Sequence, residues 1–399
     1  MRRVLQIISL LIIFIGIIIG FYFFWKLNQD YTISGKGAVA LEETGLVGDF
    51  IGGVIGTIFS LAAFIILVLT LNEQTRLSTR ERFENKFFDL LKLHRENVLE
   101  LQNNNENGRK VLHNIFEQFL ICRDEVKPFF TKKKLEDIYN PQYLEKLRTK
   151  LALTQPNINL LDCAKLNIPY IITFFGLGAQ GKMSIMDIFS NKYKPEFYQE
   201  LIDYMAMKPL ESSAYYDKWL SVYKKPYPRR VYIYKAIRDR RNDRNLEYPE
   251  SDINEKSKQY FYNSDFIKYY GGHQYQLGHY FRHLFLSFTF INERPFLTDN
   301  EKYYYAKILR AQLSTSEQAL LFINSLSCLG LTWDLIPNVK KHRFDFIYKK
   351  RLAAKRLITK YNLITNLAGR EIFGIVFNEF YPNVKFEFSD TDLNSTLDA

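Results

Sequence analysis

Two long apolar runs near the N-terminus constrain the fold of this chain more than any other feature. Residues 4–25 contain no charged side chain, and neither do residues 50–71. At a rise of about 1.5 Å per residue, each run is long enough to cross a hydrocarbon layer about 30 Å thick. The first run is longer than the apolar part of a secretory signal, and no small-residue cleavage site follows it. The sequence therefore predicts a transmembrane hairpin over residues 1–71, with a loop at 26–49.

The charges that flank the two runs predict the orientation of the hairpin. Basic residues lie before the first span and after the second: Arg2, Arg3, Arg76, Arg80 and Arg82. The connecting loop instead holds more acidic than basic side chains. Because basic flanks stay in the cytoplasm, we expect both termini inside and the loop outside.

Both spans carry small residues one helical turn apart, namely Gly16 and Gly20 in the first, and Gly48, Gly52, Gly56 and Ser60 at the second. Small residues at this spacing let helix backbones approach closely inside lipid. The ladders either hold the hairpin together within one subunit or mediate assembly into a homo-oligomer, and both alternatives stay open. Neither span has an ionisable side chain, so any conduction would require several hairpins.

The rest of the chain carries all of its excess charge. The formal net charge is +11, while the charges of residues 1–71 cancel. A hydrophobic fraction of 47% with 33 Phe and 27 Tyr excludes a disordered chain. The three cysteines share no ligand-like spacing, which favours buried thiols in a reducing compartment over a disulfide framework or a zinc site.

Beyond the hairpin the pattern is mainly that of α-helices. Apolar residues recur at helical spacing over 72–101, which predicts a membrane-proximal connecting helix followed by an all-α cytoplasmic domain at 102–386 and an acidic disordered tail at 387–399. Further helices are expected at 109–127, 133–149, 195–207, 298–312, 315–329 and 341–378, the last one broken. Strand-like alternation occurs at 168–175 and 231–234, and residues 242–265 form a polar excursion.

Two helix starts have a capping box, in which two side chains satisfy each other's backbone N–H groups. Thr298 precedes Glu301 by three residues, and Ser314 precedes Glu317 by the same interval. These pairs predict that helices begin directly after Thr298 and Ser314.

Several blocks, taken in order, resemble the family of phage abortive infection (AbiC-like) proteins. They are GDFIGGVIGTIFSLAAFIILVLTLNEQ at 48–74, RFENKFFDLLKLHRENV at 82–98, GR at 108–109, LGHYFRHLF at 277–285 and EKYYYAKILRAQLSTSEQALLFINSLS at 301–327. The resemblance implies antiphage defence by a protein anchored in the bacterial inner membrane, whose activation stops an infected cell before phage matures. It implies no catalytic residues.

Two local motifs suggest ligand chemistry. GLGAQGKMS at 176–184 follows an apolar run as a phosphate-binding loop does, but Met183 stands where a P-loop needs Ser or Thr. A glycine-rich connection between helices is the alternative. In the second motif, His279 and His283 lie one turn apart beside Arg282, with His273 upstream. HxxxH spacing can hold zinc, yet no third ligand follows, and histidines that hydrogen-bond inside the domain fit equally. We predict no metal and no cofactor.

A ribonuclease is a further hypothesis, because helical defence toxins often use an arginine and a histidine a turn or more apart. Arg109 and His113 are the nearest candidates, one residue closer than we would expect. Whether the chain is an enzyme is left open by the sequence, with a non-enzymatic role favoured.

Two basic clusters are the strongest charge signal. Residues 224–244 hold nine basic and two acidic side chains with tyrosines interleaved, and residues 340–360 hold nine basic and one acidic. The candidates for anion or nucleic-acid contact are Arg229, Arg230, Arg238, Arg240, Arg241, Lys349, Lys350 and Arg351. Basic side chains with aromatic rings can grip single-stranded nucleic acid. The same charges would also attract a tethered domain to an anionic membrane leaflet. A lipid surface, solvent and an acidic protein therefore remain alternatives to nucleic acid.

Two functions follow from these patterns. In the first, the cytoplasmic domain senses a phage component or nucleic acid, and the hairpins assemble to perturb the lipid bilayer. In the second, the chain is a membrane-tethered nuclease or nucleotide-binding toxin. A relay module that recruits a separate killer protein is a third possibility.

Overall fold

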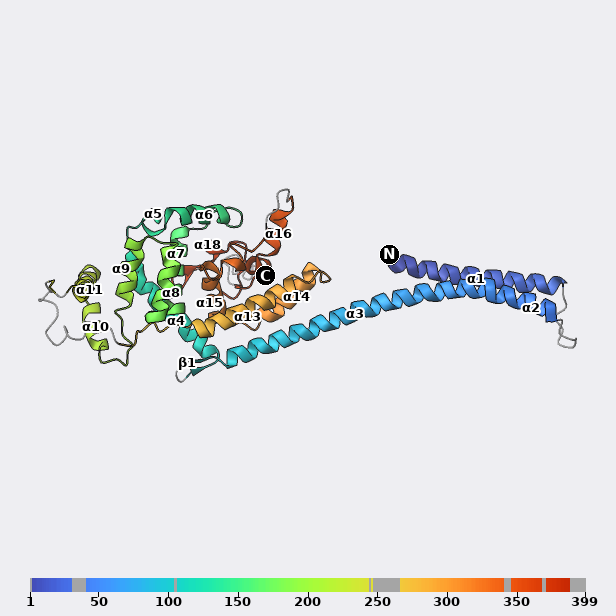
Figure 1. Ribbon diagram of the computed structural model, residues 1–399, viewed down its shortest axis with the longest axis horizontal. Coiled ribbons are helices and arrows are strands. Elements are labelled where there is room, and N and C mark those ends of the chain that lie inside the picture. Colours follow the sequence, from blue (N-terminus) through green and yellow to red (C-terminus); the bar gives the residue numbers. More distant parts are fainter. Residues whose placement is uncertain are drawn as a thin grey trace, which may run out of the picture. The chain divides into compact units, whose positions relative to one another are not determined.

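A computed structural model describes residues 2–30, 41–103, 106–243, 245–246, 266–340, 346–367 and 371–387 (Figure 1). Much of the predicted loop and polar excursion, Arg244 and nearly all of the predicted acidic tail lie outside these residues. The side chains of Arg2, Arg3, Arg240 and Arg241 are also not described. The chain divides into two compact units, Met1–Asp89 and Leu90–Ala399.

The first unit is a helical hairpin. Helix α1 runs over Arg2–Asp30, α2 over Leu41–Phe50, a π-helical turn over Ile51–Ile55 and α3 over Gly56–Leu99. Figure 1 shows α1 alongside α2 and the first part of α3. The stretches Val4–Gln29 and Thr44–Leu99 are long and apolar enough to span a membrane, and the shares of their most apolar windows buried within the protein are only 11% and 6%. The apolar side chains of these two stretches are therefore largely exposed.

The glycines of the hairpin fall into two groups. A Cβ added at Gly16 would lie 3.0 Å from Ile58 Cγ2, and one at Gly20 would lie 3.5 Å from Ile55 Cδ1. Nearby, the Phe23 and Phe50 rings stack with their centroids 4.0 Å apart. The ladder of α1 therefore lets α1 approach α3 within one subunit.

The second ladder lies in a different environment. Within the described residues, a Cβ added at Gly48 or Gly52 would meet no atom within 4 Å, and one at Gly56 would approach only the Ile51 carbonyl of its own helix, at 3.6 Å. Among the described residues, no neighbour lies close enough to Gly48 or Gly52 to require a glycine there.

The second unit is built from short helices joined by turns. They are α4 (Arg109–Val126), α5 (Leu135–Ile138), α6 (Pro141–Leu151), α7 (Leu160–Phe175), α8 (Ala179–Ser190), α9 (Pro195–Met205), α10 (Tyr216–Tyr223), α11 (Tyr227–Asn242), α13 (Gln274–Asn292), α14 (Asp299–Arg310), α15 (Thr315–Leu326), α16 (Tyr348–Ala354), α17 (Leu357–Tyr361) and α18 (Phe377–Phe380). Two antiparallel ribbons, β1–β2 (Gln102–Asn103 and Glu106–Asn107) and β3–β4 (Glu371–Ile372 and Ile375–Val376), are the strands in the described part.

The centre of this unit is formed by α4, α7 and α15, which pack against one another. Every residue of α15 from Glu317 to Leu326 is buried, as is most of α7. Both capping boxes are present, and they start α14 and α15 as predicted. The predicted mainly α class is confirmed.

Three local predictions are wrong. Residues 168–175 are not a strand but the end of α7, with Pro169 inside the helix, and residues 231–234 lie within α11. The first segment is almost entirely buried, whereas in the second Ile233 and Tyr234 are buried and Tyr232 is exposed. In short apolar segments like these the pattern does not separate strand from helix. The helix expected at 133–149 is two helices, because Asn140 and Pro141 start a new one.

Candidate functional site

A cavity of about 650 Å³ lies where α3 ends and α13 begins, within the second unit. From the end of α3 and the start of β1 it is lined by Asn97, Glu100, Leu101 and Gln102. Its volume falls in the range of small-molecule sites. The cavity is therefore formed partly by the helix that continues from the second apolar span.

Helix α13 forms the other wall. Tyr275, His279 and Arg282 recur at helical spacing along the exposed face of α13 that borders the cavity, and the Tyr275 side chain is 86% exposed. Among the described residues, Arg282 has no ion pair or hydrogen bond with another side chain, and Glu100 is the one carboxylate of the lining. An exposed ring beside an unpaired guanidinium is an arrangement that can hold an aromatic anion.

The rings of two histidines, His94 and His283, lie against each other beside the cavity. The rings of His94 and His283 stack with their centroids 6.2 Å apart and their planes 16° apart, and His94 also lies against the Tyr280 ring. His94 is 2% exposed. Its Nε2, and both ring nitrogens of His283, are buried without a hydrogen-bond partner in the described part of the chain. Buried polar atoms are rarely left unpaired, so this group is the least satisfied polar cluster near the cavity.

The surroundings keep both imidazoles neutral. Burial, followed by the neighbouring His283, Arg109 and Arg95, lowers the pKa of His94 to about 4. Burial also lowers the pKa of His283. Neutral imidazoles near positive charge can accept a proton when an anion arrives.

A polar network joins this cluster to the core. The Tyr280 hydroxyl donates to Glu317 Oε1 at 3.1 Å, and Arg109 Nε lies 3.5 Å from Glu317 Oε2. The fully buried Glu317 thus serves the capping box of α15 and an ion pair at once. Arg95 Nε donates to Gln312 Oε1 at 3.0 Å, which ties the end of α3 to the turn before α15.

The predicted ribonuclease pair has structural partners. Arg109 Nη2 donates to the Gln312 carbonyl at 2.7 Å, and His113 Nδ1 lies 3.2 Å from Ser316 Oγ. Both side chains therefore fasten α4 to the start of α15.

His273 does not join the other histidines. Its Nε2 lies 2.8 Å from Gln118 Oε1, and its backbone N–H donates to the Phe174 carbonyl. Burial lowers the pKa of His273 to about 4. The structure places His279, Arg282 and His283 together and separates His273 from them.

Residues 176–178 of the glycine-rich segment connect α7 to α8, and residues 179–184 form the first turns of α8. The glycines of this segment serve a close backbone crossing. At Gly176, where φ is +75°, a Cβ would lie 2.4 Å from the Gly271 carbonyl carbon, and at Gly272 it would lie 2.5 Å from Phe175 O. A Cβ at Gly181 would also overlap Phe175 O. The expectation of a preceding strand is wrong, and the alternative of a helix connection fits.

The first turns of α8 nevertheless meet one basic cluster. Lys182 Nζ lies 2.9 Å from Asp203 Oδ1, and Arg238 Nη1 lies 3.8 Å from Asp203 Oδ2, at a cavity of about 340 Å³. Arg238 also pairs with Asp239 at 2.7 Å. Because Lys182 and Arg238 already have carboxylate partners, these two cations are less available to an anion than the composition of the lining indicates.

The tyrosines of the 224–244 cluster serve mainly the interior. Tyr234 is buried, and Tyr227 packs edge-on against Phe129. Arg230 lies over the Tyr223 and Tyr227 rings, while Arg229 lies over Tyr232, which is exposed. Few rings are thus left for stacking on bases.

The 340–360 cluster is also partly paired. Lys355 pairs with Glu293 at 3.1 Å, Arg356 with the buried Asp334 at 2.8 Å, and Lys360 with Asp299 at 3.1 Å. The Lys349 and Lys350 side chains are exposed, and Arg351 Nη2 donates to the Lys340 carbonyl.

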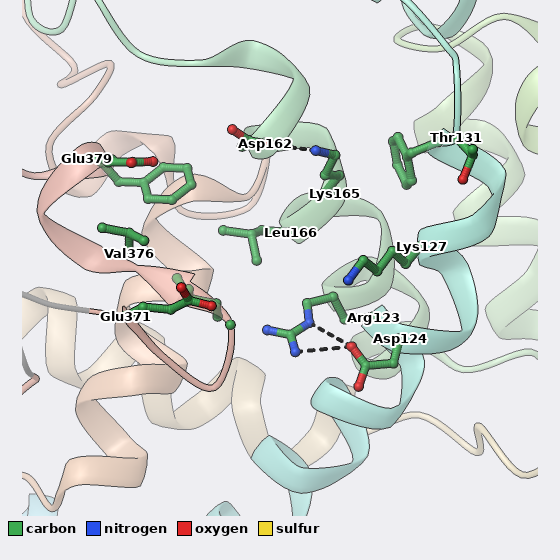
Figure 2. Close-up of a pocket in the computed structure, with 14 residues that line it drawn as sticks. Arg123, Asp124, Lys127, Thr131, Asp162, Lys165, Leu166, Glu371, Val376 and Glu379 are labelled. Carbon is green, nitrogen blue, oxygen red and sulfur yellow. Dashed lines mark hydrogen bonds and ion pairs between the residues drawn. The ribbon is translucent and has the colours of Figure 1, made fainter.

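A third cavity, of about 450 Å³, lies between α4, α7 and the β3–β4 ribbon (Figure 2). Figure 2 shows the Arg123 guanidinium between Asp124 and the ribbon. Arg123 pairs with Asp124 at 3.1 Å and also donates to the Phe373 carbonyl, while Lys165 pairs with Asp162 at 2.7 Å. With Glu371 and Glu379 added, this lining is balanced towards acid, so the cavity beside α13 is the better candidate for an anionic ligand.

Sequence analysis did not identify His94 or Tyr275, nor the polar side chains of the lining at Asn97, Glu100, Gln102, Gln276 and Tyr280. His94 occupies the helical phase of the buried Leu91 and Val98, so a histidine on an apolar face was the available signal. No group of three or more His, Cys, Asp or Glu side chains in the described residues is placed to hold a metal ion.

Comparison with known proteins identifies one family. Residues 272–344, which include α13, α14 and α15, match the family described as putative phage abortive infection protein. The predicted resemblance is thereby confirmed, and the match contains the α13 wall of the cavity. No curated protein and no solved structure matches the chain.

Proposed function

We propose that this chain, which carries the phage abortive infection segment at residues 272–344, is an effector anchored in the bacterial inner membrane with both termini in the cytoplasm. In this proposal the helical domain senses infection, and the hairpins of several copies then assemble and depolarise the membrane. The family match supports the role in phage defence, and the two exposed apolar helices support the membrane anchor.

One observation carries the assembly step. A Cβ added at Gly16 or Gly20 would contact α3 or the π-helical turn within the hairpin. A Cβ added at Gly48 or Gly52 would meet no atom within 4 Å among the described residues. A small-residue face that the described residues of its own subunit leave open can receive the backbone of a second copy. Because neither span has an ionisable side chain, a conducting path has to be formed between hairpins.

The test is the membrane potential of phage-challenged cells, followed with a voltage-sensitive dye. We expect depolarisation before lysis with the wild-type chain and its loss in Gly52→Ile, because the added side chain holds the second backbone away. Leu67→Ile, a shape change at an exposed position of the same span, is the matched control and should behave as wild type.

If cells with the Gly52→Ile variant still depolarise and the culture is still protected from phage, the proposed assembly of hairpins through this face is wrong. Protection with an unchanged membrane potential would instead favour the second candidate, a membrane-tethered nuclease or nucleotide-binding toxin. The unpaired ring nitrogens of His94 and His283 beside the cavity are the feature that favours such an enzyme.

A further inference from the structure

Beyond the membrane step, the cavity between the end of α3 and α13 offers chemistry that suits a particular class of ligand. Its lining combines one exposed aromatic ring, one unpaired guanidinium, one carboxylate and three side-chain amides. A single guanidinium neutralises about one phosphate group, so a long polyanion or a triphosphate would be poorly matched.

The aromatic part of the ligand has a platform. Tyr275 has no ring contact or hydrogen bond with another described residue and is 86% exposed, so its ring faces are free for a ligand. Stacking on a tyrosine accepts any base, because every base has a π-face. The amides of Asn97, Gln102 and Gln276 are at hand for the polar edge of that base.

The anionic part of the ligand has one cationic partner, Arg282, on the same helix face as Tyr275. Arg282 lies seven residues after Tyr275, and His279 lies between them. Arg282 has no acidic partner among the described side chains, so its two-pronged donor group is available to phosphate oxygens.

The buried imidazoles give independent support. The His94 side chain is 98% removed from solvent, yet its Nε2 has no partner in the described residues, and His283, which lines the cavity, has two such nitrogens. Buried nitrogens without partners mark a place where a ligand or a water completes the hydrogen bonding.

We infer that this cavity binds a nucleoside monophosphate unit, either as a free nucleotide or as the end of a single-stranded nucleic acid, with the base on Tyr275 and the phosphate on Arg282. The inference rests on the proposed function, because it identifies the nucleotide as the infection cue that the helical domain senses. Because the cavity includes the end of α3, ligand binding would act directly on the helix that leads to the second span.

The experiment is isothermal titration calorimetry on the full chain in nanodiscs. The probes are AMP, GMP, CMP and UMP, a 5′-phosphorylated single-stranded hexanucleotide, ribose 5-phosphate and inorganic phosphate. We expect a mononucleotide or the hexanucleotide to bind at least tenfold more tightly than ribose 5-phosphate, because only the former have a base to stack. Binding of a mononucleotide identifies a free nucleotide as the source, and binding of the hexanucleotide alone identifies a nucleic-acid end.

Two variants with matched controls test the site. Arg282→Ala and Tyr275→Ala should each weaken binding about tenfold or more. Lys150→Ala removes an exposed cation on α6, and Tyr304→Ala removes an exposed ring on α14; both should bind as wild type. Binding by neither nucleotide probe, or equal binding by the two site variants and wild type, would overturn the inference.

The two proposals can fail separately. Suppose that nucleotide binding depends on Arg282 and that cells with the Gly52→Ile variant still depolarise. The ligand site is then supported, and the assembly mechanism is wrong. A chain that depolarises membranes but binds neither nucleotide probe removes the ligand site alone.

Discussion

At the scale of single residues, buried polar groups distinguish the candidate site from the rest of the domain. Glu317 is completely buried but has the capping contacts of α15, the Tyr280 hydroxyl and Arg109 as partners. His94 is almost as buried and its Nε2 has no partner in the described residues. A paired buried group stabilises the fold, whereas an unpaired one has a cost that a ligand can remove.

The buried His94 predicts a pH dependence of stability. Its folded pKa is lowered to about 4 from an ordinary 6.5, so between these values the unfolded chain binds more protons than the folded one. Stability should therefore fall as the pH drops from about 6.5 towards 4, by on the order of 2 kcal/mol for this side chain at pH 5. The facing groups are His283 on α13, Arg109 on α4 and Arg95 on α3 itself.

Urea unfolding of the solubilised chain, followed by tryptophan fluorescence at pH 7 and pH 5, measures this effect. His94→Gln removes the titrating group, so the difference between the two pH values should shrink by about the same amount. An identical pH difference in the variant and the wild type would show that His94 does not titrate as expected.

At the scale of elements, the connection between α7 and α8 shows how glycines can imitate a phosphate-binding loop. Gly176 and Gly272 approach each other's backbones so closely that neither position has room for a Cβ. The Leu177 N–H donates to the Tyr270 carbonyl at 2.7 Å across the same crossing. The glycine pattern at 176–184 thus arises because this segment packs closely against the backbone of Gly271 and Gly272.

This crossing predicts that alanine substitutions at two glycines that are neighbours in space, Gly176 and Gly271, differ greatly in their effect on stability. Gly176→Ala should lower the free energy of unfolding by about 3 kcal/mol or more, because the residue has φ of +75° and its Cβ would overlap Gly271. Gly271→Ala, where a Cβ meets nothing within 4 Å in the described structure, should cost less than about 1 kcal/mol. Thermal melting of both variants against wild type makes the comparison; similar melting temperatures would contradict it.

At the scale of the whole molecule, α3 is the element that belongs to both units, since Gly56–Leu99 is one helix and the units divide after Asp89. Its first part packs on α1 at Gly16, and its last turns carry His94, Arg95 and Asn97. In the proposed function, a change at the cavity reaches the membrane through this helix.

Breaking α3 should therefore separate sensing from the membrane response. Thr79→Pro removes one backbone hydrogen bond and places the proline ring against the preceding turn, at a cost of about 3 kcal/mol to helix continuity. We expect unchanged membrane fractionation but loss of depolarisation after phage challenge, with Thr79→Ala as the control that keeps the helix. Full depolarisation by Thr79→Pro would mean that the signal does not depend on a continuous α3.

The sequence by itself determined features that depend on neighbouring residues. Runs of 22 uncharged residues indicate helices that need an apolar environment, and the Thr298 and Ser314 capping boxes started α14 and α15 where expected. The mainly α class and the family resemblance also came from the residues alone. The apolar runs and the capping boxes act over a few helical turns, which is why a linear pattern is sufficient for them.

Only the tertiary structure decided what depends on distant contacts. It showed that a Cβ at Gly16 would press against Ile58, whereas one at Gly52 would meet no described atom within 4 Å. It also moved His273 away from His283 and placed His94, from a different helix, beside it. Equal spacing in two segments carries no information on which face each helix buries, because burial is set by the helices that pack against it.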